Sequence, residues 1–297
     1  LDFTYGTDLD RNTLDYIHSK EDRLGGADII SGNKGLDVAI GGTGGDEIFG
    51  DDADATAGAA DKGDLLLGDN ADIFLVAKGT DTFTGFDLKL VLPLGLATDS
   101  AVKTIRTTDT IDPTNTGGSD KISGNADNDI IAGGVYGDMI YGDRKDPTTA
   151  LGKDTTSLDG DDVILGDNGA FEWLSTGRLN EITGINIEAN NSALWAKYWT
   201  AIADTNLSTL DLVTTEQPTS GGRDTIYGDN GRDLVFGGTD ADTIYGDDGI
   251  EAALPEGFGS AYNNDLLFGD HGRIYPQFST LRVDDTQDWR DAFNSRN

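Results

Sequence analysis

Aspartates spaced nine residues apart are the side chains of this sequence with the clearest chemical potential. They form three sets in the 297-residue chain: Asp28, Asp37 and Asp46; Asp120, Asp129 and Asp138; and Asp224, Asp233 and Asp242. Glycines lie shortly before each of them, and a glycine turn lets backbone carbonyls approach an ion without a Cβ clash. A hard cation such as Ca²⁺ takes about six to eight oxygen ligands. The pattern therefore predicts cation sites made of carboxylates and turn carbonyls.

Three more aspartates extend these sets: Asp64, Asp162 and Asp265, in DLLLGDN, DVILGDNG and DLLFGDHG. If a nonapeptide makes half a turn of a flattened coil, residues 18 apart stack. Asp64 would then join Asp28 and Asp46 on one edge, with Asp37 on the other, and Asp162 and Asp265 would join the equivalent rows. Carboxylates stacked at the strand spacing of ~4.8 Å repel each other unless a cation bridges them. The alternative is Asx-turn capping of the local backbone.

A second group of aspartates follows glycine where turns begin: Asp51, Asp69, Asp143, Asp167, Asp229, Asp247 and Asp270. Two interpretations of this group stay open. Each residue could occupy a left-handed turn position, as asparagine does, or could supply an additional metal ligand where the insertions leave the repeats.

The elements that position these aspartates repeat on two scales. Residues 25–51, 117–143 and 221–247 align without gaps, and an apolar residue follows each aspartate by two positions. The predicted inward residues are Ile30, Ala39, Ile48, Leu66, Ile122, Ile131, Ile140, Ile164, Ile226, Val235, Ile244 and Leu267. One inward residue per short strand between glycine turns predicts an all-β fold, a parallel β-roll or β-solenoid with Ca²⁺ in its turns.

Insertions divide this solenoid, which we expect to be continuous. Its parts are a first roll unit at 1–70, an insertion plus second unit at 71–169, an insertion plus third unit at 170–272, and the start of another insertion at 273–297. We expect a longer repetitive parent protein.

Two elements are predicted within the insertions. Apolar residues at helical spacing, including Trp195 and Trp199, predict a short amphipathic helix within 191–203 that covers the roll. A contact to a neighbouring subunit or a glycan is the alternative role of these aromatics. Residues 88–96 are expected to pair with 102–107.

The nonapeptides resemble a known family. GGTGGDEIF at 41–49 fits the pattern G-G-x-G-x-D-x-U-x throughout, and GNKGLDVAI, GNADNDIIA, GGVYGDMIY, GDNGRDLVF and GGTDADTIY fit with substitutions. This is similar to the RTX calcium-binding repeat. The resemblance implies several bound Ca²⁺ ions and export by type I secretion, with folding outside the cell or at its surface when external Ca²⁺ is met.

Composition excludes several other classes. Asp and Glu number 54 against 21 Lys and Arg, a net charge of −33, so nucleic acid is not an expected partner. No apolar run approaches the ~18 residues of a membrane span. An acidic disordered chain is disfavoured by the 36% hydrophobic content and strict periodicity. Cysteine is absent, His18 and His271 are the only histidines, and HExxH and GxSxG are missing, so we expect no enzyme activity.

The expected function is therefore structural. The sequence predicts a calcium-binding segment of a secreted surface, matrix, filament or adhesin-like protein that folds on Ca²⁺ and self-associates into rods or filaments. The alternative is a carbohydrate-binding or accessory RTX module of an extracellular enzyme, with a glycan as partner.

Overall fold

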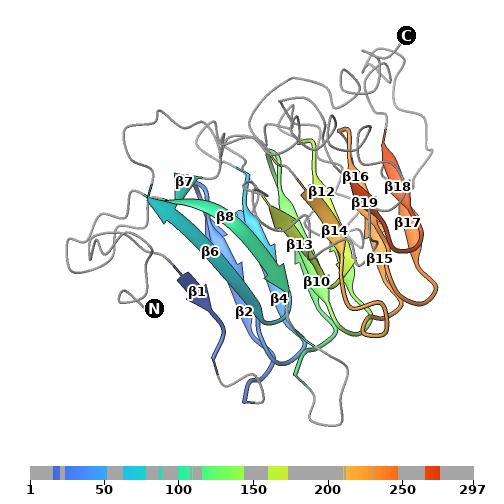
Figure 1. The fold of residues 1–297 in the computed structure, drawn as a ribbon, viewed down its shortest axis with the longest axis horizontal. Coiled ribbons are helices and arrows are strands. Elements are labelled where there is room, and N and C mark those ends of the chain that lie inside the picture. Colours follow the sequence, from blue (N-terminus) through green and yellow to red (C-terminus); the bar gives the residue numbers. More distant parts are fainter. Residues whose placement is uncertain are drawn as a thin grey trace, which may run out of the picture.

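Regular structure in the described part of the chain consists entirely of β-strands. The computed structural model describes residues 16–20, 24–51, 63–77, 87–88, 100–107, 109, 116–143, 160–172, 210, 212–229, 231–246 and 265–274. The helix predicted within 191–203 lies outside these residues. In these ranges there is no helix long and apolar enough to cross a membrane. The strands stack side by side along the long axis of the molecule (Figure 1).

Two six-stranded parallel sheets contain the strands of the nonapeptides. Sheet 1 has the order β2 (Ile29–Asn33), β4 (Glu47–Asp51), β9 (Lys121–Ser123), β11 (Met139–Tyr141), β15 (Thr225–Tyr227), β17 (Thr243–Tyr245). Sheet 2 has the order β3 (Val38–Ile40), β5 (Leu65–Leu67), β10 (Ile130–Gly134), β12 (Val163–Asp167), β16 (Leu234–Phe236), β18 (Leu266–Phe268). Successive nonapeptides alternate between the sheets. The described part of the chain therefore forms three units of four strands each: β2–β5, β9–β12 and β15–β18.

The predicted inward residues form the core between sheets 1 and 2. Nine of them are buried in one cluster, with Ile30 and Ile244 packed against its ends: Ala39, Ile48, Leu66, Ile122, Ile131, Ile140, Ile164, Ile226 and Val235. Leu267 is the exception, because its side chain is 42% exposed. It lies in the last strand of sheet 2, beside Val235, with no further described strand on its other side.

A third, antiparallel sheet is built from the ends of the insertions. Sheet 3 has the order β1 (Tyr16–His18), β6 (Ala71–Ala77), β8 (Ser100–Thr107), β13 (Gly169–Glu172), β14 (Leu212–Thr215), β19 (Arg273–Ile274), and β7 (Asp87–Leu88) also pairs with β8. The predicted pairing of 88–96 with 102–107 is not found among the described residues, where Leu88 pairs with Ser100 instead. Residues 89–96 lie outside the described part, and β8 takes β6 and β13 as its main partners.

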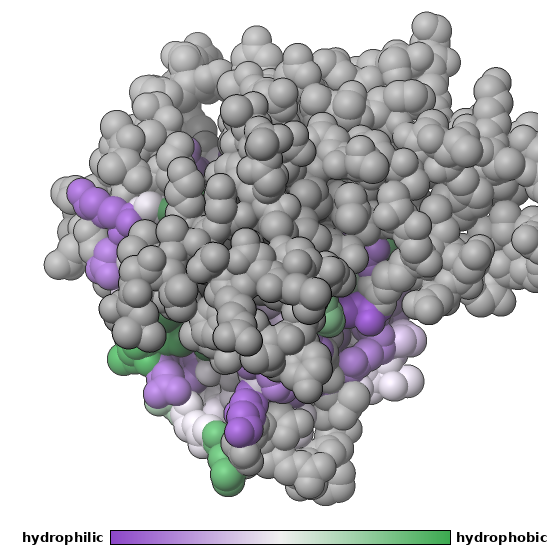
Figure 2. Space-filling view, turned by 60° about the vertical axis from the view of Figure 1, so that its left-hand side comes forward, coloured by the Kyte–Doolittle hydropathy of each residue, from purple (hydrophilic) through white to green (hydrophobic). Residues whose placement is uncertain are grey.

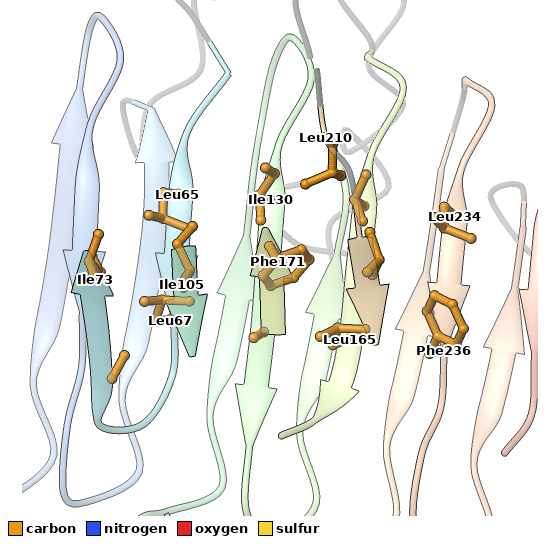
Figure 3. Packing of buried hydrophobic residues seen from close by; sticks show 14 of the residues in the cluster. Leu65, Leu67, Ile73, Ile105, Ile130, Leu165, Phe171, Leu210, Leu234 and Phe236 are labelled. Carbon is orange, nitrogen blue, oxygen red and sulfur yellow. The ribbon is translucent and has the colours of Figure 1, made fainter. Parts of the chain in front are cut away.

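Sheet 2 is buried on both faces because sheet 3 packs against its outer side. Leu65 and Leu67 of β5 point away from the first core and contact a second cluster with Ile73, Ile105 and Phe171 of sheet 3 (Figure 3). Leu65, Leu66 and Leu67 are all fully buried. A strand buried on both faces has no need of polar alternation, which explains the uninterrupted apolar runs of sheet 2.

Candidate metal centre

The aspartates of the nonapeptides form two columns, one along each edge where the chain passes between sheets 1 and 2. At each step, the backbone N–H of one aspartate donates to Oδ1 of the next. The first column is Asp37, Asp64, Asp129, Asp162, Asp233 and Asp265, with N···O distances of 2.6–3.1 Å. The second is Asp28, Asp46, Asp120, Asp138, Asp224 and Asp242, at 2.7–3.1 Å.

This arrangement corrects the predicted rows. Asp64, Asp162 and Asp265 lie in the column of Asp37, not in that of Asp28 and Asp46. Asp64 follows Asp46 by 18 residues, but the next described strand after β4 is β5, which lies in sheet 2, so Asp64 precedes a strand of sheet 2 as Asp37 does. The same holds at Asp162 and Asp265. Each column therefore runs through all three units, where the sequence predicted three separate stacks.

The second carboxylate oxygen faces a cradle between layers. A Cβ added to Gly124 would overlap both Oδ2 of Asp129 and the carbonyl oxygen of Gly142. The same pair of oxygens, one carboxylate and one glycine carbonyl from the following layer, surrounds the equivalent glycine in the other layers: Gly32, Gly41, Gly50, Gly68, Gly133, Gly142, Gly166, Gly228 and Gly237. In each layer, an aspartate Oδ2 and a glycine carbonyl oxygen therefore lie around the position that a Cβ would occupy, and only glycine leaves this position free.

Many of these carboxylate oxygens have no hydrogen-bond donor. In the described part of the chain, Oδ2 is buried and unpartnered in Asp37, Asp46, Asp120, Asp129, Asp138, Asp224, Asp233 and Asp242. Leaving an ionised carboxylate oxygen buried without a partner costs several kcal/mol, on the order of the penalty for an unpaired buried charge. The geometry is explained if a cation takes the missing contact.

Burial raises the pKa of the column carboxyls. Desolvation is the main cause at Asp120 and Asp224, where the pKa rises to about 7 and about 8, partly offset by the donated N–H groups of Asp46 and Asp138. Burial also raises the pKa values of Asp129, Asp138 and Asp233 well above the ordinary value, and repulsion from neighbouring carboxylates raises them further. Without a cation, the folded columns therefore favour protonated carboxyls.

A pH prediction follows from these raised values. In calcium-free buffer, the folded state binds more protons than the unfolded state, whose aspartates keep the ordinary pKa of 3.8. Stability is then fully present below about pH 4 and is lost as the pH rises through the folded values near 7 and 8. We expect the β-type circular dichroism signal in EDTA to fall between about pH 5 and about pH 9. A signal that rises with pH would contradict the burial of these carboxyls.

The donor set suits a hard cation. It consists of carboxylate and carbonyl oxygens, the ligands that Ca²⁺ prefers. Within the described ranges, no group of three or more His, Cys, Asp or Glu side chains comes together as a metal site. A side-chain site of the zinc type is therefore not formed there, and a cation in the cradles would depend on backbone carbonyls beside the column aspartates.

The aspartates that follow glycine have different roles from one another. Asp229 has a φ of 71°, the left-handed conformation that one of the two interpretations predicted. Asp143 accepts the N–H of Gly160 at 3.0 Å, and Asp51 is buried. Asp270 is exposed, and Asp247 lies outside the described residues.

Asp69 and Asp167 form a type of contact that neither interpretation foresaw. Asp69 accepts the N–H groups of Gly118 and Val135 at 2.8 and 2.6 Å, both in the second unit. Asp167 accepts the N–H groups of Gly222 and Thr239 in the third unit. Burial raises the pKa of Asp69 to about 9 and that of Asp167 to about 7, although the donated N–H groups lower both.

Asparagines next to these aspartates were also missed as functional residues. The Asn70 side chain donates to Asp109 and to the Thr116 carbonyl at 3.2 and 2.6 Å. Asn168, at the same place in the next GDN sequence, donates to the Asp109 carbonyl at 3.1 Å. The recurrence of GDN was the available signal for this contribution to unit joining.

The two columns, with their glycine cradles, define a calcium-binding repeat protein of the all-β class. The family model of the RTX calcium-binding nonapeptide repeat, in 4 copies, matches residues 24–56, 115–144 and 219–250. The chain therefore contains RTX calcium-binding nonapeptide repeats. The comparison with curated proteins gave no match, and the comparison with solved structures gave none either.

Proposed function

We propose that this chain is a calcium-rigidified parallel β-roll and that all twelve column aspartates contribute to its cation sites. One observation carries the proposal. In successive layers, a buried aspartate Oδ2 without a hydrogen-bond partner and a glycine carbonyl oxygen both lie next to a glycine that has no side chain. A Ca²⁺ ion at each cradle would neutralise the carboxylates and connect consecutive layers. The remaining glycine-following aspartates, including Asp51, Asp143, Asp229 and Asp247, are proposed to support these turns.

The biological role that fits this site is structural and not catalytic. The nonapeptide family is one of structural calcium binding, and a net charge of −33 suits a chain that stays unfolded until it meets Ca²⁺. We infer an extracellular or cell-surface location, reached by type I secretion, in a surface, matrix, filament or adhesin-like protein. The four parts 1–70, 71–169, 170–272 and 273–297 are proposed to form one continuous roll with insertions.

The alternative is a carbohydrate-binding or accessory module. Its candidate residues, Trp195 and Trp199, lie outside the described part of the chain, and no described contact favours it over the structural role.

Calcium dependence of folding tests the proposal directly. In EDTA at about pH 9, above the folded pKa values of Asp120 and Asp224, we expect loss of most of the β-type circular dichroism signal, because the column carboxyls are then ionised and uncompensated. Ca²⁺ in the millimolar range, on the order of that used by extracellular calcium modules, should restore it. Mg²⁺ is the matched control, since it requires shorter bonds and a near-ideal octahedron, and it should restore much less. A spectrum indifferent to EDTA and Ca²⁺ would refute the proposed function.

A further inference from the structure

The three units of the chain are joined in the same way twice. At the first junction, the buried carboxylate of Asp69 accepts two N–H groups of the second unit, those of Gly118 and Val135. At the second junction, Asp167 does the same for Gly222 and Thr239 of the third unit. We call Asp69 and Asp167 the junction aspartates. Their contacts are part of a repeated interface between units.

All three sheets continue across each junction in a fixed register. At the first junction, β4 pairs with β9 through Ile48 and Ile122, and β5 pairs with β10 through Leu66 and Ile131. The second junction repeats this with β11–β15 and β12–β16. In sheet 3, the strand that follows the last roll strand of one unit pairs with the strand that precedes the first roll strand of the next. These pairs are β6 with β8 and β13 with β14.

The described residues of the third unit present an exposed face with the same parts. Asp270 stands at the position of the junction aspartates but is exposed. Leu267 is 42% exposed, whereas its counterparts Leu66 and Ile164 are fully buried. Tyr245 ends a stack with Tyr227 and is itself 39% exposed. We call β17, β18 and β19 with Asp270 the trailing face.

The first unit presents the complementary face at the opposite end. Gly26 and Thr43 stand where Gly118 and Val135 stand in the second unit, as the alignment of the repeats shows. Leu24 and Ile29 are each 78% exposed. Figure 2 brings this end toward the viewer and shows hydrophobic surface among the described residues. We call β1, β2 and β3 with Gly26 and Thr43 the leading face.

We propose that the trailing face of one molecule docks on the leading face of a second copy of this chain, as a third junction of the kind already present twice within it. The internal junctions assign the contacts. Asp270 accepts the N–H groups of the partner's Gly26 and the partner's Thr43. Strand β17 pairs with β2, β18 with β3, and β19 with β1 of the second copy. Leu267 is covered by this contact, as Leu66 is covered within the chain.

The docking also completes a cation cradle, and in this respect it rests on the proposed function. A Cβ on Gly68 would overlap Asp120 Oδ2 and the Gly133 carbonyl of the next unit, but a Cβ on the equivalent Gly269 has nothing within 4 Å. In the docked pair, the partner's Asp28 and the partner's Gly41 fill that role. Because the two faces are different surfaces, the association is head-to-tail, and because it continues the stacking of the strands along the long axis of the molecule (Figure 1), it generates an open filament.

Sedimentation velocity in Ca²⁺ and in EDTA, run beside circular dichroism, tests this association. We expect folded chains in Ca²⁺ to form concentration-dependent, end-to-end oligomers that EDTA reverses. Leu267→Lys and Ile29→Lys place a charge on one face each and should weaken association by at least about ten-fold. Met139→Lys is the matched control, because Met139 is similarly exposed, at 41%, but lies in the middle of sheet 1. It should leave association unchanged.

Variants at the junction itself separate docking from folding. Asp270→Ala and Gly269→Ala should leave the Ca²⁺-dependent spectrum intact, because both sites are open in the single chain, and should reduce association. A monomer that is folded in Ca²⁺ at every concentration overturns the docking and leaves the proposed function standing. A chain that gains no β signal in Ca²⁺ overturns both.

A disulfide tests the register, since the chain contains no cysteine. The internal pairing places Tyr245 opposite Ser31 of the second copy, at the Cα separation of adjacent strands, which a disulfide can span. Ser31→Cys/Tyr245→Cys should therefore form covalent ladders of chains under oxidation in Ca²⁺. Ser31→Cys/Met139→Cys is the control and should not. Equal ladders from both variants would indicate nonspecific aggregation and overturn the assigned interface.

Discussion

Gly124→Ala is expected to abolish folding in Ca²⁺ or to raise the Ca²⁺ concentration for half-folding by at least about ten-fold, equivalent to ~1.4 kcal/mol. The added methyl group would overlap the carboxylate of Asp129 and the carbonyl of Gly142. It would occupy the place proposed for the cation, and both oxygens belong to buried layers that cannot move apart cheaply. A Ca²⁺ titration followed by circular dichroism measures the effect.

Gly269→Ala is the matched control for this substitution. Gly269 has the same position in its repeat, but a Cβ there meets nothing within 4 Å. Both variants lose the same glycine flexibility in the unfolded chain, so a difference between them reports on the cradle. Equal Ca²⁺ midpoints for Gly124→Ala and Gly269→Ala, measured at concentrations where the chain is monomeric, would show that the cradles hold no ion.

Asp129→Asn is expected to stabilise the calcium-free fold while removing one bound Ca²⁺. Asparagine keeps an oxygen that can accept the N–H of Asp64, so the column stays connected. Its amide replaces a buried charged oxygen that has no partner, and the amide can face the Gly142 carbonyl. Asparagine is neutral without taking up a proton, so relief from the cost of burying or protonating the Asp129 carboxylate should contribute about 1–3 kcal/mol in EDTA, by the usual penalty for an unsatisfied buried group.

Urea unfolding in EDTA at about pH 6, where the raised carboxyl pKa values keep the calcium-free chain folded, and calcium stoichiometry by equilibrium dialysis measure the two parts of this result. Asp28→Asn is the comparison variant, because Asp28 is exposed at the end of its column and its substitution should change the calcium-free stability little. If Asp129 only caps its turn, Asp129→Asn should bind as many Ca²⁺ ions as the unmodified chain, which would contradict the proposed site.

Local periodicity was enough to predict the strands and their inward residues. An aspartate followed two positions later by an apolar residue, repeated every nine residues, places Ile48, Ile131 and Val235 on one face of their strands. Side chains alternate strictly along a strand, so this assignment needs no knowledge of the neighbouring strands. The glycines shortly before each repeated aspartate likewise placed each carboxylate at a turn, so the sequence predicted which oxygen ligands the candidate site would contain.

The predicted row of Asp64 was wrong because it was assigned from residue spacing alone. The 18 residues from Asp46 to Asp64 match one full turn of two nonapeptides, but β4 is the single strand in their described part, and the next described strand, β5, belongs to sheet 2. A loop can lengthen without changing which sheet the chain enters next, because loop closure depends only weakly on length. The column to which Asp64 belongs is therefore decided by strand pairing, in which β5 lies between β3 and β10.

The aspartate columns show which features are local properties of the sequence and which depend on the tertiary structure. The sequence by itself determined that these carboxylates recur at glycine turns beside one inward side chain each, since nine-residue spacing is a local property. Only the tertiary structure decided their order within two continuous columns, the burial of Asp69 against Gly118, and the covering of sheet 2 by sheet 3. Those features join residues tens of positions apart, and their energies exist only once the layers are stacked.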